Sequence, residues 1–130
     1  MSRKFGMYST SYNIVDGCGL SVYDYCSPRF MVDILSYIYR SNELYSVIYK
    51  SLPVSGVDGT LKTRLNEKTT LNKVHAKTGS VTGSCTLAGF IHTADGRDLA
   101  FCIMNEGAIK MAPSRKIQDK ICTYLCELGL

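Results

Sequence analysis

Apolar residues recur every three or four positions in the segment that follows Ser27 and Pro28. This spacing places them on one face of a helix, and they are Phe30, Met31, Ile34, Leu35 and Ile38. A serine N-cap followed by a proline in the first helical position is a typical helix start. We therefore predict a helix from Pro28 to Arg40.

A second, shorter helix is predicted from Asn42 to Lys50, and Pro53 stops the pattern. Its apolar side consists of Leu44, Val47 and Ile48. The segment 56–60 contains two glycines and has the composition of a turn. Beyond it we expect one helical turn at residues 61–65 and a polar surface loop at residues 66–73.

The pattern changes to β-forming residues in three consecutive segments, at 74–80, 84–94 and 97–105. Gly83 separates the first two, and Asp95-Gly96, a strong hairpin signal, separates the last two. These segments predict an antiparallel meander of three strands. Apolar residues stand at consecutive positions in the second and third strands, which indicates that both faces of the sheet are covered.

A final helix is predicted at residues 113–128, ending at Gly129. Its apolar residues at helical spacing are Ile117, Ile121, Leu125 and Leu128. We expect this helix to cover one face of the sheet and the earlier helices to cover the other. The fold class is thus α/β of the α+β kind, in a single domain spanning residues 1–130. Residues 1–15 are polar and aperiodic, as in a loop or a strand that has lost its upstream partner.

Composition narrows the possible partners. Fifteen Lys and Arg residues against eleven Asp and Glu residues give a formal charge of +4, and the basic residues are scattered rather than clustered. We therefore expect no nucleic-acid partner. The sequence contains neither an apolar run long enough for a membrane span nor the apolar core of a signal peptide after Met1.

The six cysteines show no C-x-x-C spacing, and most lie in apolar segments. We interpret them as buried free thiols, with disulfides as the alternative. Cys122 and Cys126 stand one helical turn apart and are expected to be core contacts. His75 and His92 have no ligand set around them, so no metal and no cofactor is predicted.

The segment Ala76-Lys77-Thr78-Gly79-Ser80 lies in the first predicted strand and combines an ammonium group, hydroxyls and a glycine. An ammonium and a hydroxyl can bind a carboxylate, and a glycine lets a backbone or ligand approach closely. Taken alone, the same residues could be an ordinary exposed strand end.

Four other sequence segments, considered together with this one, indicate what it does. They are Asp-Gly-Cys-Gly-Leu-Ser at 16–21, Ser-Pro at 27–28, Ser-Leu-Pro-Val-Ser-Gly-Val-Asp-Gly-Thr-Leu at 51–61, Val-His-Ala-Lys-Thr-Gly-Ser at 74–80 and Leu-Ala-Gly-Phe at 87–90. Together they resemble the C-terminal part of the D-alanyl-D-alanine carboxypeptidase and endopeptidase family, the class C low-molecular-mass penicillin-binding proteins. The resemblance covers nearly the whole chain.

This resemblance implies part of the penicillin-recognising fold, similar to serine β-lactamases and transpeptidases. It also implies serine acyl transfer on peptidoglycan stem peptides, and acylation by β-lactams, in the complete enzyme. By position, Lys77, Thr78 and Gly79 would be the substrate-binding strand motif. Lys77 would supply positive potential, Thr78 would hydrogen-bond the terminal carboxylate and Gly79 would leave room for the ligand. The amide of Ser80 would belong to the oxyanion hole.

The family's other two motifs are not found. No Ser-x-x-Lys occurs in the sequence, so no catalytic residue is assigned in this chain. Ser11-Tyr12-Asn13 fits Ser-x-Asn but lies too close to Asp16 to be the family's motif, and we interpret it as a linker. The chain alone is therefore expected to be inactive, while the family's location implies the periplasm or cell wall for the parent protein.

Two residues depart from the family pattern, Cys18 in place of a serine and Asp24 in place of an asparagine. Cys18 could be a replacement nucleophile, but we favour a small buried turn residue. Asp16 and Asp58 are interpreted as turn and cap residues.

An alternative function is a non-catalytic remnant of the fold that binds stem peptides or associates with itself. A homodimer through an exposed sheet edge or face would follow from a sheet of three strands.

Overall fold

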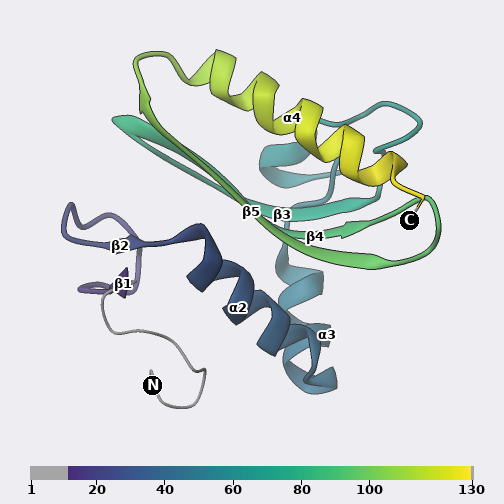
Figure 1. The fold of residues 1–130 in the computed structure, drawn as a ribbon, viewed down its shortest axis with the longest axis horizontal. Helices are drawn as coiled ribbons and strands as arrows, with labels where there is room; N and C mark the ends of the chain where they lie inside the picture. The colour runs from purple at the N-terminus through teal and green to yellow at the C-terminus, as the bar shows by residue number, and fades with distance from the viewer. Residues whose placement is uncertain (1–11, 130) are drawn as a thin grey trace.

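The fold is seen in a computed structural model that describes residues 12–129 (Figure 1). Its elements are β1 (Tyr12–Asn13), β2 (Tyr25–Cys26), α2 (Pro28–Tyr39), α3 (Asn42–Ser51), the short 3-10 helix η1 (Gly59–Leu61), β3 (Val74–Val81), β4 (Gly83–His92), β5 (Asp98–Ala108) and α4 (Met111–Glu127). Figure 1 shows α4 on one face of the main sheet and α2 and α3 on the other. The predicted α+β order and the two covered faces are confirmed. Predictions on residues 1–11 lie outside the described part of the chain.

The main sheet is an antiparallel meander in the order β3-β4-β5, as predicted. The register pairs Lys77 with Ala88, and it sets Gly89 of the central strand between Ala76 and Phe101. Gly96 has a φ of +83° in the turn between β4 and β5, which confirms the hairpin expected at Asp95-Gly96. β1 and β2 form a separate two-stranded antiparallel sheet.

The starts of α2 and α3 follow from their caps. The Ser27 hydroxyl accepts a hydrogen bond from the Phe30 amide at 3.1 Å, with Pro28 in the first helical position. The Ser41 hydroxyl accepts one from the Leu44 amide at 3.4 Å. Both caps satisfy amides that a helix leaves without intrahelical partners, and both predicted helices are confirmed.

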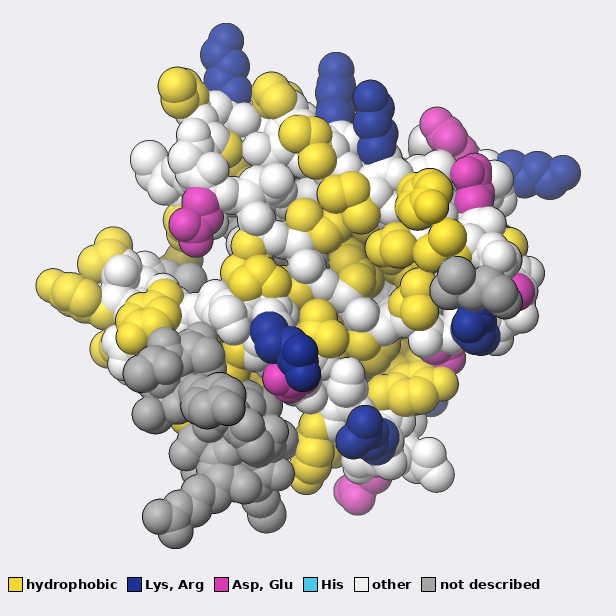
Figure 2. Space-filling view, viewed as in Figure 1, with side chains coloured by type: hydrophobic (Ala, Val, Ile, Leu, Met, Phe, Trp, Pro, Cys, Tyr) yellow, Lys and Arg dark blue, Asp and Glu magenta, His cyan; other side chains and the backbone are white. Residues whose placement is uncertain are grey.

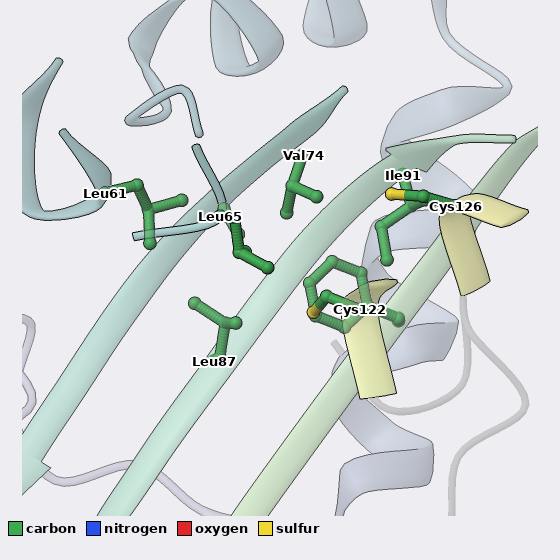
Figure 3. Packing of buried hydrophobic residues seen from close by; sticks show 9 residues of the cluster. Leu61, Leu65, Val74, Leu87, Ile91, Cys122 and Cys126 are labelled. Carbon is green, nitrogen blue, oxygen red and sulfur yellow. The ribbon is translucent and has the colours of Figure 1, made fainter. Parts of the chain in front are cut away.

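The hydrophobic core lies between the sheet and α4 (Figure 3). Its buried members are Leu61, Leu65, Val74, Ala76, Leu87, Ile91, Phe101, Cys122 and Cys126. The prediction that Cys122 and Cys126 are core contacts is confirmed. All six cysteines are free, and burial raises the pKa of Cys122 to about 12, so this thiol stays protonated near neutral pH.

The predicted apolar face of α4 was wrong at Ile117 and Ile121, whereas Leu125 packs against the core as expected. Ile117 and Ile121 are 50% and 39% exposed, while Gln118 is fully buried. The Gln118 amide donates to the carbonyl of Cys85 at 3.1 Å and to Oδ1 of Asn105 at 3.0 Å. A buried polar side chain with satisfied hydrogen bonds therefore sets the rotation of the helix, which hydrophobic spacing does not reveal. The helix also begins at Met111, two residues earlier than predicted.

The predicted apolar side of α3 was wrong at Leu44 and Val47 for a related reason, while Ile48 is half-buried. Leu44 and Val47 are exposed, whereas the rings of Tyr45 and Tyr49 lie against Phe90, with centroid distances of 5.2 and 6.1 Å. Large aromatic rings bury more area than the aliphatic residues beside them. The two aromatic residues, together with the half-buried Ile48, therefore define the packed side of α3.

The segment between η1 and β3 also differs from its prediction. The helical turn expected at residues 61–65 is replaced by η1, and Leu65 has a φ of +53° that is incompatible with a helix. The loop at residues 66–73 is confirmed as a connection without strand or α-helix, but Thr70 within it is buried. No helix of the described residues is long and apolar enough to cross a membrane.

Candidate functional site

The outer edge of β3 is covered only along its first half. The Ser55 amide donates to the carbonyl of Val74 at 2.9 Å, and the Ala76 amide donates to the carbonyl of Pro53 at 3.0 Å. Because backbone groups on a strand alternate in direction, the N–H and C=O groups of Thr78 and Ser80 point to this same edge. No backbone bond from the described residues covers them. We call these groups of Thr78 and Ser80 the open edge.

The covering segment is anchored by a buried serine. The Ser55 hydroxyl donates to the carbonyl of Thr70 at 2.6 Å and accepts from the Val74 amide at 3.0 Å. A carboxylate oxygen of Asp58 accepts from the Val54 amide at 2.8 Å. The interpretation of Asp58 as a turn residue is confirmed, although its side chain makes no cap bond to η1.

The side chains of the predicted motif point to different sides of β3. Val74 and Ala76 are buried under α4, so by strand alternation Thr78 lies on that face and Lys77 on the opposite one. Lys77 is exposed, and its ammonium group donates to the carbonyl of Thr78 at 2.9 Å. The Thr78 hydroxyl donates to the hydroxyl of Thr60 in η1 at 3.1 Å.

Gly79 has a packing role within the protein. A Cβ atom at this position would lie 2.4 Å from Oγ1 of Thr86 on β4. The absence of a side chain therefore lets β3 and β4 keep their spacing around Thr86. The sequence analysis allowed a neighbouring backbone or a ligand to approach this glycine, but it could not name Thr86, because the paired residue becomes known only with the register.

A hollow of about 410 Å³ opens beside the motif, between η1, β3 and the first turns of α4. We call it the β3–α4 hollow. Its hydroxyl-bearing lining residues are Thr60, Thr63 and Thr78, and its charged lining residues are Arg64, Arg115, Lys116 and Asp119. Sequence reasoning missed this site, because three separate segments meet there and only β3, with Thr78, carries a recognisable motif.

The charges around the hollow are unequally compensated. The Arg64 guanidinium, which is 12% exposed, donates to Asp119 at 2.7 Å and to Oε1 of Gln118 at 3.1 Å. Arg64 and Asp119 thus neutralise each other. Within the described residues no ion pair involves Arg115 or Lys116. The hollow therefore carries net positive charge.

The remaining candidates lie in the turn between β1 and β2. The Asp16 carboxylate accepts hydrogen bonds from the amides of Cys18 at 3.0 Å, Gly19 at 2.6 Å and Ser21 at 2.8 Å. The amide of Gly19, with that of Ser21, lowers the pKa of Asp16 to about 2, and the turn role of Asp16 is confirmed. Cys18 lies in this turn but is exposed, so the prediction of a buried residue was wrong. Ser11 of Ser11-Tyr12-Asn13 lies outside the described residues.

His75 lies on the α3 side of β3. Its ring stacks on Tyr49 with a centroid distance of 3.9 Å, and burial lowers its pKa. The Nδ1 atom is buried without a hydrogen-bond partner among the described groups. In residues 12–129, no group of three His, Cys, Asp or Glu residues is arranged to hold a metal ion.

Comparison with known proteins gives a consistent family. The model of the D-Ala-D-Ala carboxypeptidase 3 (S13) family matches residues 2–128. The D-alanyl-D-alanine carboxypeptidase DacB of Haemophilus influenzae is 37% identical over 101 residues, which are 76% of this chain and 21% of that protein. The D-alanyl-D-alanine carboxypeptidase of Actinomadura sp. is 35% identical over 117 residues, which are 86% of this chain and 21% of that protein.

Solved structures agree with the sequence matches. The crystal structure of penicillin-binding protein 4 from H. influenzae aligns with a TM-score of 0.84 and 29% identity, covering 97% of this chain and 30% of that one. The predicted fold class is thereby confirmed. The chain spans about a fifth of the length of the curated relatives named here. It belongs to the D-Ala-D-Ala carboxypeptidase 3 (S13) family.

Proposed function

We propose that the chain is the C-terminal part of a serine-type D-Ala-D-Ala carboxypeptidase, one partial domain of a transpeptidase-like enzyme acting on peptidoglycan stem peptides. The observation that carries this proposal is the position of Lys77-Thr78-Gly79-Ser80, where the cover on β3 ends and the open edge begins. An extended peptide can add to such an edge as a further strand. The chain contributes the surface on which the peptide lies.

Each residue of the motif has a role that its position allows. The exposed Lys77 ammonium would raise the positive potential near the edge. The Thr78 hydroxyl, whose single proton is donated to Thr60 in this structure, would rotate to donate it to the terminal carboxylate of the peptide. The Ser80 amide, which points out of the open edge, would donate to the oxyanion formed during acyl transfer. Gly79 allows β3 to pair closely with β4 at Thr86, which keeps the strand that carries these groups extended.

Catalysis by this chain alone is not proposed. The family's nucleophile belongs to a Ser-x-x-Lys motif, which is absent from these 130 residues. Without the nucleophile, covalent catalysis is lost, because nucleophile and base act as a unit. The complete enzyme would act in the periplasm or at the cell wall, where stem peptides and β-lactams are encountered.

Two measurements test this proposal. A fluorescent penicillin should leave no covalent adduct on the denatured chain. Chemical-shift titration of the chain with Nα-acetyl-D-Ala-D-Ala should move the amide signals of Thr78 and Ser80, and Lys77→Ala should weaken the binding. Lys68→Ala, which removes an exposed cation outside the motif, is the control. A stable penicillin adduct would contradict the proposal. So would a peptide affinity that is unchanged in Lys77→Ala.

A second candidate is a self-associating or binding remnant of the fold, with a homodimer through a sheet edge or face. Self-association is favoured by a surface other than the sheet edge or face, the outer side of α4, where Ile117, Ile121 and Tyr124 are 50%, 39% and 66% exposed. Figure 2 shows hydrophobic side chains gathered across the middle of one face, over the strands between α4 and α2. Exposed apolar patches of this kind favour association.

Analytical ultracentrifugation tests self-association by measuring the mass of the species in solution. The chain should sediment as a dimer, and Ile121→Lys should shift it towards the monomer without unfolding it. A chain that is strictly monomeric at millimolar concentration would argue against self-association.

A further inference from the structure

We propose that residues 12–26, which we call the β1–β2 hairpin, form a docking surface for a separate polypeptide that carries the family's Ser-x-x-Lys motif. The two chains would assemble into one active site without a peptide bond between them. This inference rests on the function proposed above and names the partner that completes its site. The partner contributes the nucleophile, which this chain lacks, and this chain contributes the Lys77-Thr78-Gly79 strand.

The β1–β2 hairpin carries a set of large apolar side chains that are open to solvent. Val22 is 89% exposed, and each of the others is more than half exposed; they are Ile14, Val15, Leu20, Tyr23 and Tyr25. Hydrophobic side chains project from the molecule in Figure 2 at the place where Figure 1 shows this hairpin. Apolar surface gathered on one short segment of a folded protein marks an interaction site.

The hairpin is held in one shape before any partner binds. Its turn is fixed by the amide bonds to Asp16 described above and by the Asp24 carboxylate, which accepts from the Val15 amide at 2.6 Å. The ring of Tyr12 stacks on Phe30 in the first turn of α2, with a centroid distance of 4.4 Å. The apolar side chains therefore stand on a preformed support, and docking orders little additional backbone.

The rest of the chain is folded without using this surface. The hydrophobic core lies between the main sheet and α4, and none of its buried members among the described residues comes from the hairpin. The chain is thus a folded piece that presents an apolar face, and a partner can cover this face without rearranging the core.

The nature of the partner follows from what the chain lacks. The chain accounts for 30% of the structure of penicillin-binding protein 4 with which it aligns, so most of that body has no counterpart here. A second copy of this chain could cover apolar surface, but it would bring no Ser-x-x-Lys. A polypeptide of the same family that contains the motif supplies both the covering surface and the nucleophile.

The test uses the part of H. influenzae DacB that precedes the segment matching this chain, here called the upstream piece. It is prepared in two forms, fused to the start of this chain and as a separate polypeptide refolded together with it. Fluorescent penicillin should label the upstream piece in both forms, and neither polypeptide should be labelled alone. Intact DacB is the positive control. Labelling of the separate pieces should rise and saturate as this chain is titrated in.

A matched pair of variants locates the contact. Val22→Lys places a charge in the docking surface, so about tenfold more of this chain should be needed for half-maximal labelling of the separate upstream piece. Val47→Lys, which changes an exposed valine on α3, should titrate like the unaltered chain. In the fused form Val22→Lys should keep its labelling, because a covalent link gives the two parts a high effective concentration.

Four results would overturn the inference. The first is a fused form that is labelled while the separate pieces are not, which would leave the proposed function standing. The second is equal titration by Val22→Lys and Val47→Lys. The third is self-association of the chain that Val22→Lys abolishes, since the hairpin would then belong to a second copy. The fourth is a fused form that is not labelled, which would overturn the proposed function as well.

Discussion

The two faces of the sheet are covered in different ways. On the α4 face, aliphatic residues, Phe101 and two cysteines form a closed core, and Leu87 and Ile91 have no exposed surface. On the α2–α3 face, the tyrosine rings of α3 contact Phe90, while Leu44 and Val47 face outward with 42% and 64% exposure. Stability should therefore be concentrated on the α4 face, because removal of apolar area from water is the main favourable contribution to folding.

The candidate site is divided between these two faces of the sheet. Thr78 and the β3–α4 hollow lie on the closed face, so their geometry depends on the best-packed part of the molecule. Lys77 lies on the other face, on a side chain that is exposed. A site of this kind combines a rigid binding surface with an adjustable cation.

The largest effect is expected for Gly89→Ala. The added Cβ would lie 2.1 Å from the carbonyl oxygen of His75 and 2.7 Å from Cα of Ala76, so the β3–β4 pair would have to separate. We expect a loss of more than about 3 kcal/mol in the free energy of unfolding, at the upper end of overpacking costs. Urea denaturation measures it. Gly17→Ala, with nothing within 4 Å, is the control and should cost almost nothing.

A leucine pair tests the comparison directly. Leu87→Ala removes a fully buried side chain on the α4 face and should cost about 2–5 kcal/mol. Leu44→Ala removes a side chain that is 42% exposed on α3 and should cost less than about 1 kcal/mol. Equal losses in urea denaturation would show that the two faces are equally stabilising.

The two arginine ion pairs offer a smaller contrast. Arg64→Ala leaves Asp119 and the Gln118 oxygen without their partner, and should cost about 1–3 kcal/mol. Arg29→Ala breaks a pair with Asp33 in which the arginine is 85% exposed, and should cost less than about 0.5 kcal/mol. Thermal denaturation of both variants measures the difference. A larger loss of stability for Arg29→Ala than for Arg64→Ala would contradict this prediction.

The smallest effect is a pH dependence that originates at His75. Burial lowers its pKa from the ordinary value of 6.5, so the folded state binds the proton less readily than the unfolded state. The contribution of His75 is fully present above pH 6.5 and is lost as pH falls through the lowered pKa. Urea denaturation at several pH values below 6.5 should show this loss.

The matched variant is His75→Phe, which keeps a ring against Tyr49. It should abolish the part of the pH dependence that falls in this window. The low pKa of Asp16, about 2, acts in a separate window at lower pH. If the stability of the variant depends on pH as that of the unaltered chain does, the effect originates at a group other than His75.

The sequence allowed the elements to be predicted better than their orientation. Capping and hairpin chemistry are local, so Ser27, Pro28 and Asp95-Gly96 located α2 and the β4–β5 turn. The packed sides of α3 and α4 depend on tertiary partners: Gln118 is buried because Cys85 and Asn105 receive its hydrogen bonds. Hydrophobic spacing contains no information about such partners.

The same distinction holds for the candidate site. The Lys-Thr-Gly motif is contiguous, so its position on β3 was predicted from the residues and from their resemblance to the family. The β3–α4 hollow could not be predicted, because Thr60, Thr78 and Arg115 become neighbours only in the folded chain. Motifs reveal groups that act from one segment, whereas cavities arise from the packing of several.

The segment Pro53–Ser55 has one more consequence, for the way copies of the molecule could aggregate. Unpaired strand edges promote the indefinite stacking of chains into fibres. Here the edge of β3 is occupied as far as Ala76, so an approaching strand has a fixed end point and cannot slide along β3. On the outer side of the segment, the Val54 amide is already bonded to the Asp58 carboxylate. The segment that defines the open edge therefore also acts as a safeguard against fibrous assembly at this edge.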